Sequence, residues 1–145
     1  MPIKDDVQNA MKDALRNKDQ LRLDCLRMIK GALLNKEKEG SGEVSEEVAV
    51  QVLRSEVRKR QDSIGIFREH GKEDDAIRTE QEIAIIDSFL PSQLSREQVE
   101  YKVRAYLAEH PDINHAGRLT GALKKELGDE VDGKVLNEVC RKVLG

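Results

Sequence analysis

The segment GRLTGALKKELG, residues 117–128, combines three glycines with three basic residues inside one expected helix. An interior helical glycine costs about 1 kcal/mol relative to alanine, so the repeated glycines need an explanation. A bare strip of backbone admits either a neighbouring helix or a polynucleotide backbone, and cations along its edge would supply phosphate contacts. The chemistry that these residue types could perform is therefore phosphate binding.

A helical wheel at 100° per residue defines two sides of this helix. The glycine strip consists of Gly117, Gly121, Lys124 and Gly128, and Arg118 and Lys125 lie on its solvent side. Leu119, Leu123 and Leu127 cluster near 240° and should face the core. Gly128 also fits the left-handed C-cap of the helix. On spacing alone, we favour a neighbouring helix against the strip.

A final amphipathic helix is expected from about Gly133 to Leu144. Asp132 is well placed as its N-cap, and a capping carboxylate makes this helix end a poor phosphate site. The apolar stripe of the helix leaves four polar residues exposed: Lys134, Asn137, Arg141 and Lys142.

The other polar residues of the sequence form no complete active site. His70, His110 and His115 lie at expected helix ends or in loops, and none makes the i, i+4 pair of a helical zinc site. The sequence also contains no phosphate-binding loop and no nucleophile elbow. Cys25 and Cys140 fall in apolar stripes, which indicates buried free thiols. We therefore expect no catalytic residue, no metal site and no cofactor.

A second basic cluster, RSEVRKRQDS, places Arg54, Arg58 and Gln61 on one helical face, with further basic residues alongside. Glu56 and Asp62 interleave with these cations. Because opposite charges three or four residues apart pair on a helix, we expect intrahelical ion pairs here rather than a binding site.

Apolar residues recur with helical spacing along almost the whole chain, which predicts an all-α fold. Four helices are expected in an N-terminal domain, residues 1–92: from about 3 to 16, from a cap at Asp19 to about Glu39, from a cap at Ser45 to near Gly71, and from there to Leu90. In the first helix, Val7, Ala10, Met11, Ala14 and Leu15 should lie on the buried side.

The segment FLPSQLSREQ marks the clearest boundary in the sequence. Pro91 disfavours continuation of the helix at Leu90. Ser95 and Gln98 fit a capping box that opens a new helix. These signals predict a hinge at residues 91–94 and a three-helix tail domain, residues 93–145.

Charge and hydropathy limit the classes of function. The chain has 145 residues and a net charge of −3, so any phosphate binding must come from a local patch. The residues after 94 carry nine basic and nine acidic side chains. No run of 18 apolar residues occurs, and the N-terminus lacks the apolar stretch of a signal peptide. We therefore expect a cytoplasmic protein that does not associate with membranes.

The chain resembles the GatB/YqeY family over nearly its whole length, most closely the small stand-alone YqeY-like proteins. The segments that carry the resemblance are RMIKGALLNKEKE, KRQDSIGIFREHGKEDDAIRTEQEIAIIDSFLPSQLS and GALKKELGDEVDGKVLNEV. The resemblance implies an all-helical protein whose three-helix tail is similar to the C-terminal domain of the GatB subunit of glutamyl- and aspartyl-tRNA amidotransferases. In that enzyme the tail domain helps to recognise tRNA, and amidation occurs in other domains and subunits.

Seven residues fall by motif position in the segment that corresponds to that tail, and we take them as candidate nucleic-acid contacts: Gly117, Arg118, Gly121, Lys124, Lys125, Lys134 and Asn137. The resemblance makes an RNA backbone as good an explanation of the glycine strip as a neighbouring helix.

The function that we expect is that of a tRNA-associated accessory protein. It would be related to tRNA-dependent amidotransferase, a carbon–nitrogen ligase with glutamine as amido donor, and it would not be catalytic alone. The expected partners are tRNA and a protein that takes part in tRNA-dependent amidation. Two alternatives remain: a helical protein–protein adaptor without nucleic-acid binding, and an enzyme subunit that works only with separate catalytic partners.

Overall fold

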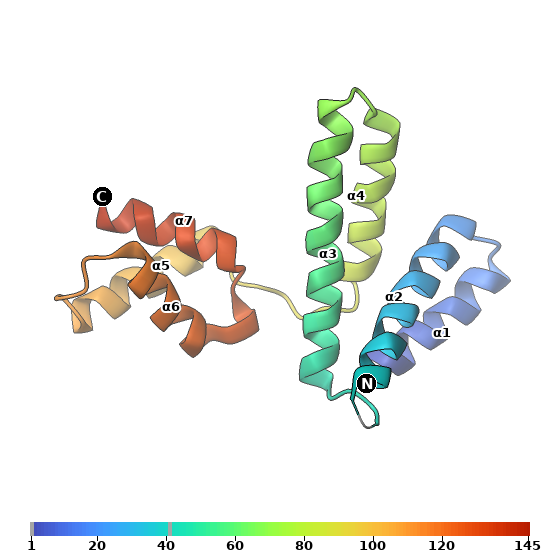
Figure 1. Ribbon diagram of the computed structural model, residues 1–145, viewed down its shortest axis with the longest axis horizontal. Coiled ribbons are helices and arrows are strands. Elements are labelled where there is room, and N and C mark those ends of the chain that lie inside the picture. Colours follow the sequence, from blue (N-terminus) through green and yellow to red (C-terminus); the bar gives the residue numbers. More distant parts are fainter. Residues whose placement is uncertain (1, 41) are drawn as a thin grey trace. The chain divides into compact units, whose positions relative to one another are not determined.

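The computed structural model describes residues 2–40 and 42–145 (Figure 1). The described residues form helices and no strand, which confirms the expected all-α class. The elements are α1 (Ile3–Arg16), α2 (Gln20–Glu39), α3 (Glu46–Glu69), α4 (Glu73–Asp87), α5 (Arg96–Glu109), α6 (Ala116–Leu127), a short 3-10 helix η1 (Gly128–Glu130), and α7 (Gly133–Leu144). None of the helices in the described ranges is long and apolar enough to cross a membrane.

The chain divides into two compact units, residues 1–90 and 91–145, which we call the N-terminal unit and the tail unit. The sequence placed the domain boundary after residue 92. That the two parts are independent domains stays a prediction, and the last experiment of the Discussion tests it.

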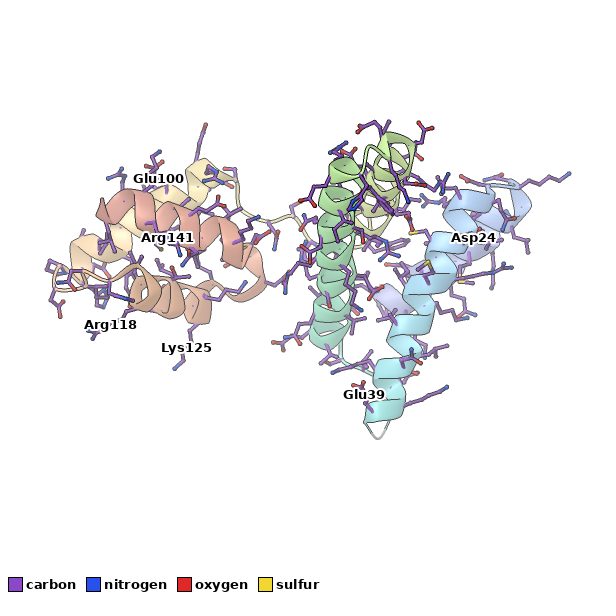
Figure 2. All side chains as sticks on the ribbon, turned by 45° about the horizontal axis from the view of Figure 1, so that its top comes forward. Asp24, Glu39, Glu100, Arg118, Lys125 and Arg141 are labelled. Atoms are coloured by element: carbon purple, nitrogen blue, oxygen red, sulfur yellow. The ribbon has the colours of Figure 1, made fainter. Side chains whose placement is uncertain are left out.

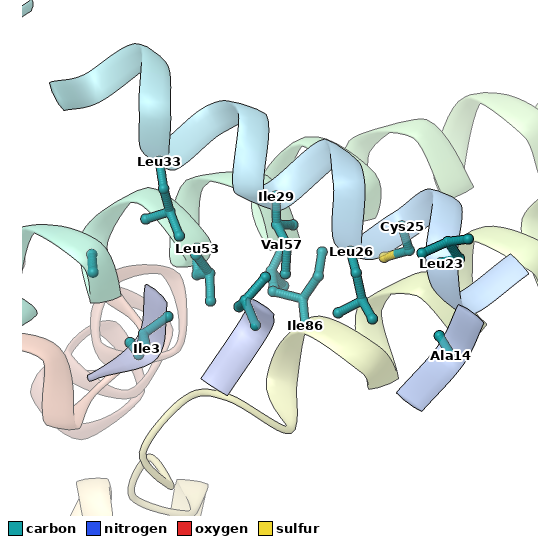
Figure 3. Packing of buried hydrophobic residues seen from close by; sticks show 12 residues of the cluster. Ile3, Ala14, Leu23, Cys25, Leu26, Ile29, Leu33, Leu53, Val57 and Ile86 are labelled. Atoms are coloured by element: carbon teal, nitrogen blue, oxygen red, sulfur yellow. The ribbon is translucent and has the colours of Figure 1, made fainter. Parts of the chain in front are cut away.

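Two helical pairs, α1 with α2 and α3 with α4, build the N-terminal unit (Figure 1). The predicted caps open two of its helices: the Asp19 side chain accepts a hydrogen bond from the N–H of Arg22, and Ser45 accepts one from Val48. One core joins the four helices of this unit (Figure 3), with Ile3 and Ala14 of α1, Leu26, Ile29 and Leu33 of α2, Leu53 and Val57 of α3, and Ile86 of α4.

The prediction that Leu15 faces the core is wrong, because this side chain is 64% exposed. Ile3, Val7 and Ala14 form the buried line of α1. Leu15 lies 100° further round the helix than Ala14, so its side chain points away from the core.

The turn between α1 and α2 places a lysine where glycine is the usual residue. Lys18 has a φ of 56°. Its N–H donates to Leu15 O, and the Asp19 N–H donates to Ala14 O, which is the Schellman pattern of a helix end. The same pattern ends α3, where Gly71 occupies the equivalent position with a φ of 69°.

Replacing Lys18 with glycine should therefore raise the free energy of unfolding by about 1 kcal/mol, because the left-handed conformation costs an L-residue roughly that amount. Urea denaturation followed by circular dichroism measures the change. The matched variant is Gly71→Ala, which should lower stability by a similar amount. A loss of stability in Lys18→Gly would contradict this explanation.

The tail unit is built around α7, which packs against both α5 and α6. The predicted capping box of Ser95 and Gln98 opens α5. The Asp132 side chain accepts from the N–H of Lys134 at the start of α7. The core of the unit consists of Val99, Val103, Ile113, Leu119, Leu123, Leu127, Val131, Leu136, Val139 and Cys140.

Part of the segment predicted as a hinge is bound to the tail unit. The Leu94 N–H donates to Glu130 O at 2.8 Å, and the Gln93 side chain donates to Asp129 O at 3.0 Å. These bonds fix residues 93 and 94 against η1. The GDE sequence of η1 thereby supplies main-chain acceptors that anchor the start of the tail unit.

Candidate functional site

Gly117 lies beside the N-cap of α6 rather than against another helix. The N-cap is His115, whose Nδ1 accepts a hydrogen bond from the Arg118 N–H at 3.3 Å. A Cβ on Gly117 would stand 3.0 Å from the His115 ring carbon Cε1 and 3.3 Å from its Nδ1. Glycine at this position leaves room for the capping imidazole.

Gly121 faces open space: apart from its chain neighbours and the adjoining backbone of α6, no heavy atom of the described residues lies within 4 Å of the place a Cβ would take. Of the two alternatives left open for the glycine strip, a neighbouring helix of the tail does not cover Gly121 within the described residues. The reason is the direction from which α7 approaches α6: the Asn137 side chain donates to Thr120 Oγ1 at 3.3 Å. Thr120 lies 100° before Gly121 on the helix, so α7 packs beside the strip.

Two of the seven candidate residues, Lys124 and Asn137, have side chains that form hydrogen bonds within the fold. The Lys124 ammonium donates to Val131 O at 2.7 Å and so ties α6 to the segment after η1. The Asn137 amide is bound to Thr120, whose own hydroxyl donates to Ala116 O at 2.7 Å. These side chains hold α6, η1 and α7 together, which makes them poor choices for a test of ligand binding.

The cations Arg118, Lys125 and Lys134 remain exposed on α6 and α7. Arg141 joins them, because it follows Lys134 by seven residues and lies on the same face of α7. Arg141 is exposed, as the pattern of the last helix predicts, and it is an addition to the seven candidates. Figure 2 labels Arg118, Lys125 and Arg141, with Lys125 extending away from α6. We call Arg118, Lys125, Lys134 and Arg141 the four cations.

The four cations form no ion pair with any described residue, unlike several other basic residues of the tail unit. Those others are held by two carboxylates: Arg96 pairs with Glu138 at 2.6 Å, and Arg104 and Lys142 pair with Glu100 at 3.0 and 3.6 Å. A hydrogen bond from Arg104 lowers the pKa of Glu100, and one from Arg96 lowers the pKa of Glu138. The four cations therefore lie on α6 and α7 without ion pairs to the described residues, although Lys134 also helps to lower the pKa of Glu138 and the segment is neutral by count.

Comparison with known proteins identifies the family. A family model for Yqey-like proteins matches residues 4–144. The chain belongs to the YqeY family. A relative from Lachancea thermotolerans, named Altered inheritance of mitochondria protein 41, mitochondrial, is 34% identical over 128 residues. The match covers 83% of this YqeY-family chain and 68% of the relative.

The basic cluster of α3 contains the expected intrahelical ion pairs. The Glu56 carboxylate accepts from Lys59 at 3.0 Å and from Arg60 at 3.3 Å. Arg60 is only 7% exposed, which the pattern of charges along the helix does not predict. Its Nε lies 3.6 Å from the Glu82 carboxylate of α4, and its Nη1 donates to Glu56 O at 3.1 Å. Arg60 thus connects α3 to α4.

Both thiols are free and buried, as predicted. Burial raises the pKa of Cys25 to about 11, and burial is also the main cause of the raised pKa of Cys140. At neutral pH both are protonated, and a protonated thiol is a poor nucleophile. Across residues 2–40 and 42–145, no group of three or more His, Cys, Asp or Glu side chains is placed to hold a metal ion.

Gly117 and Gly121 of the glycine strip should respond differently to alanine. Gly121→Ala should raise the free energy of unfolding by about 0.5–1 kcal/mol, because alanine is the better helix former and the site is open. Gly117→Ala should give no such gain, because its Cβ displaces the His115 ring that caps α6. Thermal unfolding of both variants beside the wild type measures the difference. Equal gains would show that the His115 cap contributes nothing.

Proposed function

We propose that this YqeY-family chain is a tRNA-associated accessory protein, related to tRNA-dependent amidotransferases and not catalytic by itself. The observation that carries the proposal is the set of four exposed cations on α6 and α7 that form no ion pair with the described residues. Exposed arginine and lysine side chains free of local ion pairs are the groups that neutralise nucleic-acid phosphates. The resemblance of the tail to an amidotransferase domain that helps to recognise tRNA supports tRNA as the ligand.

Each part of the proposed surface has its own role. Arg118, Lys125, Lys134 and Arg141 contact phosphates, and the open backbone at Gly121 lets the RNA chain approach α6 closely. The side chains of Lys124 and Asn137 fix the geometry of the surface. A protein of tRNA-dependent amidation is the further partner that we propose, with the cytoplasm as the location. The name of the relative from Lachancea thermotolerans refers to mitochondria, and this concerns that protein alone.

Titration with tRNA at two salt concentrations tests the proposal. Arg118→Glu combined with Lys125→Glu should weaken binding and lower the slope of log affinity against log salt by about 2, since each lost phosphate contact removes roughly one unit. The matched control is Lys12→Glu with Arg58→Glu, which makes the same charge change at exposed positions of the N-terminal unit. No binding by the wild type, or equal affinities for wild type and the α6 variant, would refute the proposal.

A protein–protein adaptor is the second candidate, and a groove between α2 and α3 favours it. The groove has a volume of about 370 Å³, and its apolar lining residues are Ala32, Val48 and Val52. Lys36 and Lys59 also line it. An adaptor without nucleic-acid binding shows no affinity for tRNA at either salt concentration, so the same titration separates the two candidates.

A further inference from the structure

A second hollow lies within the tail unit, between α5 and α6, with a volume of about 240 Å³. Tyr101 and Tyr106 of α5 line it together with Leu123 and Leu127 of α6. The chain has two tyrosines and no tryptophan, so both tyrosines meet in this groove. We call it the tyrosine groove.

The two rings differ in how firmly they are held. Tyr106 stacks on the His110 imidazole, with ring centroids 4.2 Å apart and an interplanar angle of 16°. Tyr101 is 76% exposed, the highest fraction among the large hydrophobic side chains of the described residues. An exposed aromatic ring beside a fixed one is the arrangement with which proteins stack single-stranded bases.

One cation and two carboxylates line the groove, so a phosphate can bind there at Lys102 alone. Lys102 lines the groove and forms no ion pair with the described residues, so its ammonium is available to a phosphate. Glu109 and Glu126 also line it and form no ion pair within the described ranges. Their carboxylates would repel a phosphate, but they can accept hydrogen bonds from the amino groups of a base.

We infer that the tyrosine groove receives an unpaired base of a bound RNA, stacked on Tyr101, with the adjacent phosphate at Lys102. The inference rests on the proposed function, because it adds base stacking to the phosphate contacts of α6 and α7. The apolar floor of Leu123 and Leu127 suits the face of a base. A base within a duplex is stacked on both faces and cannot enter, so the groove distinguishes single-stranded from paired RNA.

Intrinsic tyrosine fluorescence tests the inference, because both tyrosines lie in the groove and the chain has no tryptophan. The probes are a short single-stranded RNA and the duplex formed from the same strand. The single strand should quench the fluorescence of the wild type more than the duplex does. Tyr101→Ala should weaken binding of the single strand by roughly five- to a hundredfold, the range of one base–aromatic stack. Tyr101→Phe should keep the affinity.

Leu15→Ala is the matched control, because it removes another exposed apolar side chain, in α1, and should leave both affinities unchanged. Unchanged single-strand affinity in Tyr101→Ala, or equal quenching by the duplex, overturns the inference. If the wild type still binds RNA with a steep salt dependence, that result leaves the proposed function intact. If the wild type binds neither RNA, the proposed function fails together with the inference.

Discussion

Replacing Arg60 with alanine should lower the free energy of unfolding of the N-terminal unit by about 3–5 kcal/mol, the range for breaking a buried ion pair from one side. Arg60 is 7% exposed, and its two acidic neighbours, Glu56 and Glu82, have side chains only 12% and 20% exposed. Removal of the guanidinium would leave both carboxylates without their cation in a poorly hydrated place. The loss of volume adds a cavity cost.

The Arg60 guanidinium is not fully satisfied. Its Nε is buried and has no hydrogen-bond partner, because the Glu82 oxygen lies 3.6 Å away. Its Nη2 donates to the sulfur of Met28 at 3.8 Å, a weak bond. Since a buried polar network with an unmade bond stabilises less than a complete one, the charge itself contributes little net stability. The large expected loss in Arg60→Ala therefore comes from the stranded carboxylates and the cavity.

A second variant separates these causes. Arg60→Met with Glu56→Gln and Glu82→Gln keeps most of the volume and removes the stranded charge, so it should recover most of the loss. Arg58→Ala, at an exposed position of the same helix, should change stability by about 0.5 kcal/mol or less. Urea unfolding gives each free energy. A cost below about 1 kcal/mol for Arg60→Ala would mean that α3 and α4 pack without this connection.

The residues at which most of the helices begin could be predicted from the capping residues close to them in the sequence. Asp19, Ser45 and Asp132 accept hydrogen bonds from main-chain N–H groups at the predicted helix starts. Ser95 and Gln98 form the complete capping box. These caps were predictable because the residue and the N–H that it satisfies lie within three positions of one another.

The apolar periodicity of α3 indicates that position 60 is buried, although arginine is usually an exposed residue. Leu53, Val57, Ile64 and Phe67 step along α3 so that position 60 completes the same stripe. The basic cluster predicts intrahelical ion pairs for its cations, and it does not predict burial of Arg60, because arginine is rarely buried without partners. Its partner Glu82 lies 22 positions away, on another helix, and spacing within α3 cannot reveal it.

The face of α6 on which each residue of the candidate site lies could be predicted from the sequence. The contacts that these residues make could not. The helical wheel placed Leu119, Leu123 and Leu127 in the core, where the structure has them. It could not show which side of α6 would receive α7, and this decides that Gly121 is open. Histidine is not among the preferred N-cap residues, so His115 gave no signal. The hydrogen bond from the Lys124 ammonium to Val131 O forms because the chain turns back toward α6 after η1. The residue pattern within α6 does not show this turn.

Leu136→Ala should lower the free energy of unfolding of the tail unit by about 3–5 kcal/mol. Leu136 is fully buried in the core of that unit, and buried Leu→Ala changes in another protein cost 2.7–5.0 kcal/mol by the transfer and cavity terms. A unit of this small size has a low free energy of unfolding, so a loss of this magnitude removes much of it. The variant should therefore unfold the tail near room temperature or at low urea.

The change should stay within the tail unit if the two units are independent domains. Leu53→Ala is the matched variant, since Leu53 is fully buried in the core of the N-terminal unit. Additivity of distant sites predicts that each variant shifts the unfolding of its own unit alone.

The distribution of aromatic residues makes this separation measurable. Tyr101 and Tyr106 lie in the tail unit and Phe67 and Phe89 in the N-terminal unit, so tyrosine fluorescence reports the tail unit alone. Far-ultraviolet circular dichroism reports the helices of both units. Leu136→Ala should move the tyrosine transition to lower urea, and Leu53→Ala should leave it in place while an earlier dichroism transition develops. A single transition that both probes share in both variants would show that the units unfold together, because their stabilities are then coupled.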